Sequence, residues 1–465
     1  MPENRTTGSG DWPEERKKEY IRTSNDNLFV EAGAGAGKTT LLTRRIVNLI
    51  KAGKRPEGFV LITYTEEAAG KLRERIVRCL KEEQILAASD VYQNSNPAVG
   101  DREQVLEEVE RAVRMAGSMC ITTMYGFCRM ILREETADPD SGGYSAQLSA
   151  VCSEELPPDE ILRRADTLVR ERGDIRRRLK KRFSQIYVDE FQDADRTQID
   201  LIWRLATEEG EKDRLRDNCL FVVGDSKQSI YWYRGAESYL MDEIQEKMER
   251  AENASVLHLV WNFRSDVKVI SWVNRKFKKL FPNYWEMKSM MNSDGKGHRK
   301  DFDRDGIMAA PDFAGKPAAM IRSFKNKDPR VDWQDFLVIT LNEEERDACL
   351  LDLSKAGIPA AAKAKEEKHA GHVRVLTVYQ VKGLAGNIVV LADHMPKAGT
   401  HEPGEQVPEV SRSFEDRRAL TKERLTRLEY VAITRARFAA VFLGTAATRG
   451  WFTDPVYQIE SLPHI

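Results

Sequence analysis

Residues 28–40 read LFVEAGAGAGKTT, an apolar run followed by alternating alanine and glycine and then by a lysine and two threonines. This order predicts a buried strand, a tight turn and the start of a helix. Such a turn lets backbone N–H groups surround a phosphate chain, with Lys38 as a point charge and Thr39 as a magnesium ligand. The candidate phosphate-binding residues are Ala32, Gly33, Ala34, Gly35, Ala36, Gly37, Lys38, Thr39 and Thr40. A plain strand-to-helix connection is the alternative, but the lysine and hydroxyl at these offsets favour a nucleoside triphosphate.

The composition narrows the class of protein. The 465 residues are 41% hydrophobic and 32% charged, yet the formal net charge is −1. A chain of this length builds more than one domain, and any nucleic-acid surface on it must be local. We find no signal peptide and no apolar run of membrane-spanning length. Six cysteines without a C-x2-C pair indicate buried thiols in a reducing compartment. We therefore expect a cytoplasmic protein without membrane contact.

Short apolar runs alternate with helical stretches along the chain, which predicts parallel sheets covered on both faces. Over this length they favour an α/β fold of two doubly wound lobes rather than one. We place the first lobe in residues 1–260, with a short helical insert near 133–184. The second lobe takes residues 261–465, with an irregular segment near 281–328. The apolar runs are residues 28–30, 60–62, 186–188, 221–223, 336–339, 373–378, 388–391 and 441–443.

The segment from Ile161 to Arg182 is unusually basic, with ten lysines and arginines against three acidic residues. It is either the solvated face of a helix or a surface that contacts the phosphate backbone of a nucleic acid. The sequence leaves both interpretations open.

A carboxylate pair follows the apolar run at 186–188. After a buried strand, Asp189 is placed to hold magnesium and Glu190 to polarise the attacking water. Further along, residues 221–236 combine a strand, a glutamine suited to sensing the terminal phosphate (Gln228), and an aromatic cluster ending at Arg234. Aromatic side chains of this kind stack on nucleic-acid bases in a sequence-tolerant way.

Eight segments in this order resemble the motifs of UvrD-like superfamily 1 helicases, the group that includes Rep, PcrA and the RecB and AddA motor subunits. They are AGAGAGKT (32–39), TYTEEAAGKLRERI (63–76), ITTMYGFC (121–128), DEFQD (189–193), GDSKQSIYWYRGA (224–236), LVWNFRS (259–265), TVYQVKGL (377–384) and YVAITRAR (430–437). The resemblance implies two RecA-like lobes that bind ATP and Mg²⁺ and act on single-stranded DNA or DNA ends.

The resemblance also implies roles for individual residues in the first lobe. Lys38 and Thr39 would bind the phosphates and Mg²⁺, and Asp189 would hold the metal through the metal's coordination shell. Glu190 would be the catalytic base, and Gln228 would sense the γ-phosphate.

Two arginines of the second lobe, Arg264 and Arg435, would serve as arginine fingers. The cleft between the lobes would then close only while the γ-phosphate is present. The positions that match contacts to single-stranded DNA are Tyr64, Thr123, Tyr233 and Arg234.

Five side-chain positions depart from the group's pattern. Glu15 replaces the adenine-recognising Gln, Glu66 and Glu67 replace an Asn-Lys pair, Tyr379 replaces a His and Ala385 replaces a Glu. Only about a dozen mostly polar or small residues stand between Pro359 and the apolar run at 373–378 that leads into the TVYQVKGL motif, where relatives insert a large helical subdomain. In its small size and short inserts, the chain resembles the helicase-like subunit of the Gabija anti-phage system, which works with an ATP-gated nuclease partner.

Two functions follow from the resemblance. The first is an ATP-dependent translocase or helicase that is stimulated by single-stranded DNA and acts in DNA processing or anti-phage defence. The alternative is an ATPase subunit that senses DNA ends or nucleotide and regulates a partner nuclease without unwinding DNA. A scaffold that does not hydrolyse ATP is disfavoured because every phosphate-handling residue is present.

Overall fold

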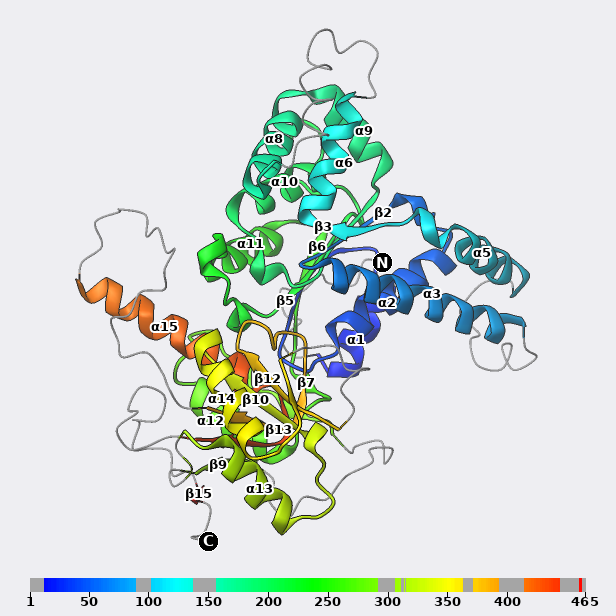
Figure 1. Cartoon of the computed structure of the whole chain (residues 1–465). Coiled ribbons are helices and arrows are strands. Elements are labelled where there is room, and N and C mark those ends of the chain that lie inside the picture. Colours follow the sequence, from blue (N-terminus) through cyan, green and yellow to red (C-terminus); the bar gives the residue numbers. More distant parts are fainter. Residues whose placement is uncertain are drawn as a thin grey trace. The chain divides into compact units, whose positions relative to one another are not determined.

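The computed structural model describes residues 12–88, 102–136, 156–291, 306–310, 313, 315–362, 371–392, 414–443 and 460–461. The chain divides into two units, the first made of Met1–Ala32 with Gly37–Leu259 and the second of Gly33–Ala36 with Val260–Ile465. Each unit is built around its own parallel sheet (Figure 1). This confirms the predicted α/β fold of doubly wound parallel sheets.

Six parallel strands form the sheet of the first unit, in the order β3-β2-β4-β5-β1-β6. They are β1 (Asn27–Ala32), β2 (Phe59–Thr63), β3 (Cys120–Thr123), β4 (Gln185–Val188), β5 (Leu220–Gly224) and β6 (Ala254–Leu259). All residues of β1, β2, β4 and β5 are buried, as expected for strands covered on both faces. The carboxyl ends of β4, β5 and β1 therefore lie next to one another at one edge of the sheet.

Helices cover both faces of this sheet. They are α1 (Glu14–Thr23), α2 (Lys38–Lys51), α3 (Glu66–Ala88), α5 (Arg102–Met115), α6 (Met124–Thr136), α8 (Pro158–Glu171), α9 (Gly173–Arg182), α10 (Arg196–Ala206) and α11 (Ser238–Arg250). On one face, Phe29, Ile62 and Val188 pack with apolar side chains of α6, α8, α9, α10 and α11. The alternate strand residues point to the other face, where α2 packs.

A buried arginine on α2 fixes this second face. Arg45 donates to the carbonyls of Ile21 (2.7 Å) and Ser24 (2.9 Å), which tie α2 to the end of α1. Its other nitrogens donate to the Tyr187 hydroxyl (3.1 Å) and to Oδ1 of Asn218 (3.1 Å). Because a guanidinium carries five donors in a fixed plane, one side chain can join a helix, a loop and a strand.

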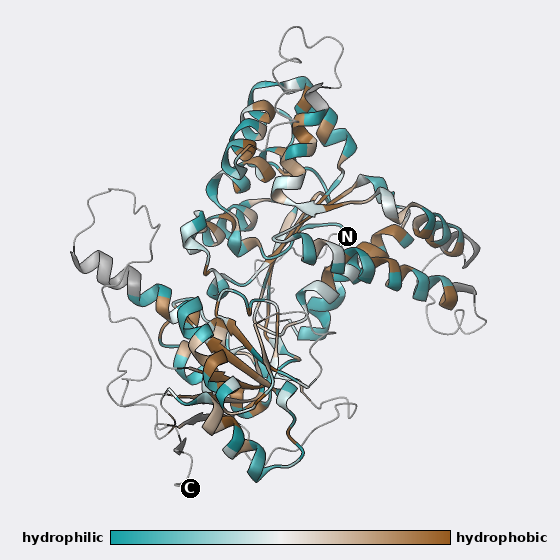
Figure 2. Ribbon diagram, viewed as in Figure 1, coloured by the Kyte–Doolittle hydropathy of each residue, from teal (hydrophilic) through white to brown (hydrophobic). Residues whose placement is uncertain are grey.

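Seven parallel strands form the sheet of the second unit, in the order β11-β12-β10-β13-β14-β9-β15. They are β9 (Gly306–Ala309), β10 (Phe336–Thr340), β11 (Ala360–Ala361), β12 (Val373–Thr377), β13 (Gly386–Leu391), β14 (Ala436–Phe442) and β15 (Glu460–Ser461), with β7 (Trp261–Asn262) and β8 (Lys288–Ser289) pairing separately. In Figure 2 the strands are brown and the surrounding helices are largely teal, the pattern of a sheet buried between amphipathic helices.

Among the described residues of the second unit, the helices that flank this sheet are α12 (Val267–Phe277), α13 (Pro317–Lys327), α14 (Glu343–Lys355) and α15 (Phe414–Ile433). Phe324 of α13 and Leu353 of α14 pack with Val338 and Ile388 on one face. On the other face, Trp272 of α12 lies 6.1 Å from Phe442 between ring centres.

The structure differs from the prediction of an irregular segment near 281–328. There β9 pairs with β14, and α13 begins at Pro317. Proline suits the first helical position because its missing N–H would have no partner there. The described residues do not include 292–305. They also leave out the central part of the predicted helical insert (137–155), which contains Cys152.

Candidate active site

The glycine-rich turn joins β1, which ends at Ala32, to α2, which begins at Lys38. Gly35 and Gly37 have φ of +73° and +81°, a region that L side chains rarely adopt. Gly37 is the N-cap of α2, so no side chain occupies the position in front of the helix N-terminus. Nζ of Lys38 donates to the Ala32 carbonyl (3.1 Å). The turn therefore presents backbone N–H groups and an ammonium group in the way that phosphate binding requires.

The middle of the turn, Gly33–Ala36, belongs by its contacts to the second unit. Nδ2 of Asn262 donates to the Ala34 carbonyl (2.6 Å), and the Phe263 N–H donates to the Gly35 carbonyl (2.9 Å). A Cβ on Gly35 would lie 2.8 Å from Cβ of Arg264. The segment around Asn262 thus sets the conformation of the turn and requires glycine at position 35.

The carboxylate pair lies directly after β4. The Asp189 N–H donates to the carbonyl of Ile62 (3.0 Å), and Oδ1 of Asp189 accepts from the Glu190 N–H (3.0 Å). Glu190 has φ of +53° and ψ of +42°, a left-handed conformation that is uncommon for a residue with a side chain. Such backbone strain persists where surrounding structure imposes it, and it clusters at active sites.

The hydroxyl of Thr39 and the carboxylate of Asp189 are oxygen donors of the type that Mg²⁺ prefers. Within the described ranges, no group of three or more His, Cys, Asp and Glu side chains is arranged to hold a metal ion. The two oxygen donors fit Mg²⁺, which usually takes one or two protein ligands together with substrate phosphates.

A buried ionic cluster lies beside these residues at the carboxyl end of β5, and we call Glu31, Asp225 and Lys227 the buried triad. Nζ of Lys227 lies 2.7 Å from Oδ1 of Asp225 and 3.0 Å from Oε1 of Glu31. Burial is the largest influence and raises the pKa of Asp225 and of Glu31, but the Lys227 ammonium acts together with Lys38 near Asp225 and with the hydrogen bonds from Ser226 and Gln228, and their sum holds both pKa values below their usual range. All three groups are therefore charged at neutral pH.

Gln228 is buried in the 3₁₀ turn η5 (Ser226–Gln228) that follows β5. Its Nε2 donates to Oδ2 of Asp225 (2.8 Å), so the carboxylate of Asp225 orients the amide of Gln228. The sequence predicted Gln228 as a site residue but assigned no role to Asp225, Lys227 or Glu31. In the sequence, the only local signal for these three residues is that each is a charged residue at or just after the end of an apolar strand.

Tyr64, Tyr231, Tyr233 and Arg234 form what we call the aromatic–arginine cluster. The rings of Tyr64 and Tyr231 stack with centres 4.9 Å apart. The guanidinium carbon of Arg234 lies 5.4–5.6 Å from the centres of the three rings, and Nη1 donates to the Tyr64 hydroxyl (2.7 Å). Tyr233 is 46% exposed. The cluster thus presents an aromatic face and a positive charge to solvent, as single-strand binding requires.

Thr123, the fourth predicted DNA contact, is buried at the end of β3. Its hydroxyl donates to Oε1 of Glu66 (2.8 Å) and accepts from the Gly126 N–H (3.2 Å). In this structure its contacts are within the protein, at the start of α6.

The structure brings the two candidate arginine fingers together inside the second unit. Nη1 of Arg264 donates to the carbonyl of Thr434 (2.9 Å), the residue before Arg435. Arg435 is only 1% exposed, and its Nε donates to the Val431 carbonyl (3.0 Å). Both guanidinium groups thus contact the end of α15.

The basic segment Ile161–Arg182 forms α8 and α9, whose apolar side chains face the core. Most of its basic residues are paired with acidic ones. The ion pairs are Arg163 and Arg164 with Glu160, Arg170 and Arg204 with Asp166, Arg172 and Arg178 with Asp174, and Arg176 and Lys180 with Glu209. This pairing favours the solvated-face interpretation.

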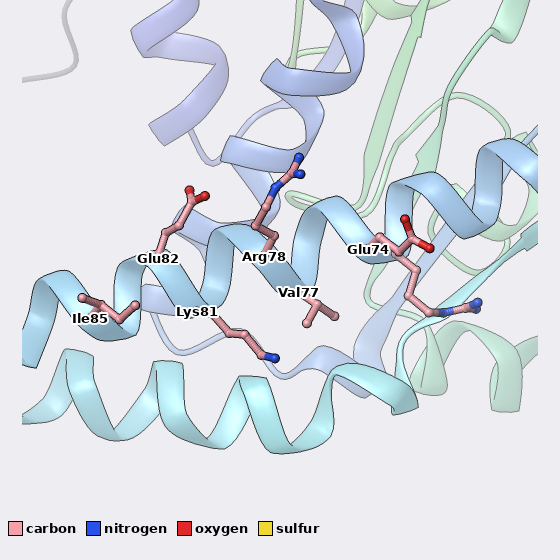
Figure 3. Close-up of a pocket in the computed structure, with 7 residues that line it drawn as sticks. Glu74, Val77, Arg78, Lys81, Glu82 and Ile85 are labelled. Atoms are coloured by element: carbon pink, nitrogen blue, oxygen red, sulfur yellow. The ribbon is translucent and has the colours of Figure 1, made fainter. Parts of the chain in front are cut away.

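A hollow along the outer part of α3, between Arg73 and Ile85, is shown in Figure 3. Its lining comes from charged and aliphatic side chains of α3 alone, and it contains none of the candidate site residues. In the described parts of the chain, no helix is long and apolar enough to cross a bilayer.

Comparison with known proteins identifies the family. Residues 13–151 and 152–249, about half of the chain, match the model of the UvrD/REP helicase N-terminal domain. The chain belongs to the UvrD/REP helicase family. The resemblance inferred from the order of the motifs is thereby confirmed, and the matched residues contain the phosphate-binding turn, the carboxylate pair and the aromatic–arginine cluster.

Members of the UvrD/REP family with curated descriptions are similar over part of their length. The ATP-dependent DNA helicase PcrA of Bacillus subtilis (strain 168) is 27% identical over 302 residues, covering 56% of this chain and 39% of the relative. PcrA of Staphylococcus epidermidis is 26% identical over 299 residues, with the same coverage. PcrA of Leuconostoc citreum is 26% identical over 333 residues, covering 62% of this chain and 42% of the relative. The chain therefore matches about two fifths of the length of these helicases.

Proposed function

We propose that this UvrD/REP family member is an ATPase that is stimulated by single-stranded DNA and translocates along it as a helicase. The observation that carries the proposal is the segment Asp225–Arg234. It begins with the residues that orient Gln228 at the candidate nucleotide site and ends with Tyr233 and Arg234 of the aromatic–arginine cluster. Only a few residues of one segment therefore separate Gln228, the proposed sensor of the terminal phosphate, from the proposed DNA contact.

The residues at the sheet edge support hydrolysis of a nucleoside triphosphate. Lys38 and the N–H groups at the start of α2 would hold the phosphates. Glu190 would accept the proton of the attacking water as the bond from water oxygen to γ-phosphorus forms, and the bond to the bridging oxygen breaks to give ADP and phosphate. Thr39 and Asp189 would hold Mg²⁺, which when bound supplies charge neutralisation on the phosphates.

Arg264 and Arg435 are proposed as the second unit's contribution to the same reaction. Guanidinium groups that reach the transferring phosphoryl group contribute about 10³–10⁵ in rate. They would also make binding of the triphosphate depend on both units, which is how closure of a cleft is linked to the presence of the γ-phosphate.

The proposal is tested by measuring ATP hydrolysis with and without an oligothymidylate. We expect strong stimulation by the single strand, and loss of hydrolysis in Lys38→Ala and Glu190→Gln. A matched control is Lys54→Ala, which removes a lysine of the loop after α2. A rate that is indifferent to the single strand, or that survives Glu190→Gln, would contradict the proposal.

A second candidate function is regulation of a partner nuclease, as in anti-phage defence, without strand separation. It is favoured by the short interval between β11, which ends at Ala361, and β12, which begins at Val373. Robust displacement of one strand from a tailed duplex by this chain alone would favour the helicase. ATPase activity without displacement, together with ATP-dependent inhibition of a co-purifying nuclease, would favour the regulator.

A further inference from the structure

One buried glutamine has no role in the site described above. Gln192 lies in the 3₁₀ turn η4 (Phe191–Asp193) after β4 and is 2% exposed. Its Nε2 donates to Oε2 of Glu190 (2.5 Å), and its Oε1 accepts from the N–H of Asp225 (2.9 Å). Both ends of the amide are thus engaged, one by the proposed catalytic base and the other by the backbone after β5.

The backbone around Gln192 is shaped to this contact. A Cβ on Gly224 would lie 2.5 Å from Oε1 of Gln192, so a residue with a side chain at position 224 would displace the amide. Glu190 itself holds a left-handed conformation. Since neither the glycine nor the strained backbone is needed for a strand to end, the two features indicate that the direction of the Glu190 carboxylate is imposed.

The contact continues to the proposed phosphate sensor. The Asp225 N–H donates to Oε1 of Gln192, and the Asp225 carboxylate accepts from Nε2 of Gln228 (2.8 Å). Lys227 neutralises that carboxylate from the other side (2.7 Å). Two buried amides therefore meet at Asp225, which joins the proposed base that follows β4 to the proposed sensor that follows β5.

We propose that Gln192 is a positioning residue that fixes the Glu190 carboxylate and couples its orientation, through Asp225, to Gln228. This inference rests on the proposed ATPase function. A general base must lie within hydrogen-bond reach of the proton it removes, and a carboxylate free to rotate satisfies this only part of the time. Loss of the amide should therefore slow the chemical step while leaving the phosphate-binding turn intact.

The test uses the full chain and three variants. Gln192→Met keeps the volume of the side chain but removes both hydrogen bonds. Gln192→Glu keeps the acceptor for the Asp225 N–H but turns a carboxylate toward Glu190. Gln185→Met is the matched control, because Gln185 is equally buried (2% exposed) at the other end of β4 and donates to the Asn218 carbonyl.

For each variant we would measure kcat and KM for ATP at saturating oligothymidylate, together with the thermal midpoint. We expect Gln192→Met to lower kcat about 10- to 100-fold with KM within about twofold. Gln192→Glu should lower kcat at least as much, because the donor to Glu190 is lost. Gln185→Met should retain kcat, whatever its effect on the thermal midpoint.

Three outcomes would overturn the inference. One is an unchanged kcat in Gln192→Glu, which would show that the amide only supports the backbone at Asp225. Another is an equal fall of kcat in Gln192→Met and Gln185→Met, which would indicate general destabilisation. If Gln192→Met fails to fold, the isosteric Gln192→Glu decides. Absence of hydrolysis by the wild-type chain would instead overturn the proposed function, and this inference with it.

Discussion

Replacing Lys227 by Met removes the only cation of the buried triad. Nζ of Lys227 lies 2.7 Å from a carboxylate oxygen of Asp225 and 3.0 Å from one of Glu31, and the three side chains are at most 7% exposed. Removing one partner of a buried ion pair costs about 3–5 kcal/mol, because the remaining charge stays buried without compensation. For a unit of this size, that corresponds to a fall of about 6–20 °C in the thermal midpoint.

The destabilisation should depend on pH in a defined direction. In the wild type, Lys227 holds the pKa values of Glu31 and Asp225 below those of the unfolded chain, so they stabilise the fold above about pH 4 and lose this effect in acid. In Lys227→Met, burial is the largest influence and is opposed by the hydrogen bonds from Ser226 and Gln228 and by Lys38 near Asp225, so we expect both pKa values to rise above the unfolded ones. The variant then loses stability as pH rises above about 4, until both carboxylates are ionised in the folded state.

Calorimetric unfolding of the full chain between pH 5 and pH 8 would test this reasoning. The gap in thermal midpoint between wild type and Lys227→Met should widen with pH. Lys247→Met is the matched control, since Lys247 pairs with Glu243 (3.0 Å) on the surface of α11 and such pairs contribute about 0–1 kcal/mol. A Lys227→Met midpoint equal to that of Lys247→Met, or a gap that does not change with pH, would refute the assignment of charge.

Three further variants have expected outcomes. Arg45→Lys cannot reproduce the planar set of donors to α1, Tyr187 and Asn218, and should lower the free energy of unfolding by about 3 kcal/mol in urea titrations. Arg234→Lys keeps the charge but loses the planar contact with the tyrosine rings, so affinity for an oligothymidylate should fall about tenfold in anisotropy titrations, with basal ATP hydrolysis retained. The double charge reversal Arg177→Glu and Lys181→Glu on α9 should leave the salt dependence of DNA binding unchanged, because the basic residues around them are paired within the protein. If the slope of log affinity against log salt concentration fell by roughly two, these residues would contact DNA phosphates.

The strands could be predicted from the sequence because parallel strands buried on both faces read as continuous apolar runs, as Phe221–Val223 does. The glycine-rich turn between β1 and α2 was equally visible, since its glycines and Lys38 are local in sequence. The buried triad was not, because Glu31 and Lys227 are 196 positions apart and meet only when β1 pairs with β5. Helix α13 was missed because its apolar face is interrupted by lysines and arginine that the structure leaves on the other side.

In the proposed function, the order of the strands would allow coupling between nucleotide and DNA to be contained largely in one sheet edge. Parallel neighbours end at the same edge, so Glu190 after β4 and Gln228 after β5 reach it from adjacent strands. Tyr231 follows Gln228 closely in the sequence, and its buried ring stacks on that of Tyr64, which follows β2. Any displacement of Gln228 must therefore be absorbed within Ser229 and Ile230, both buried, or be passed to the aromatic–arginine cluster. Close packing leaves little room for absorption, and this makes the cluster the expected point where loss of the γ-phosphate alters the grip on a single strand.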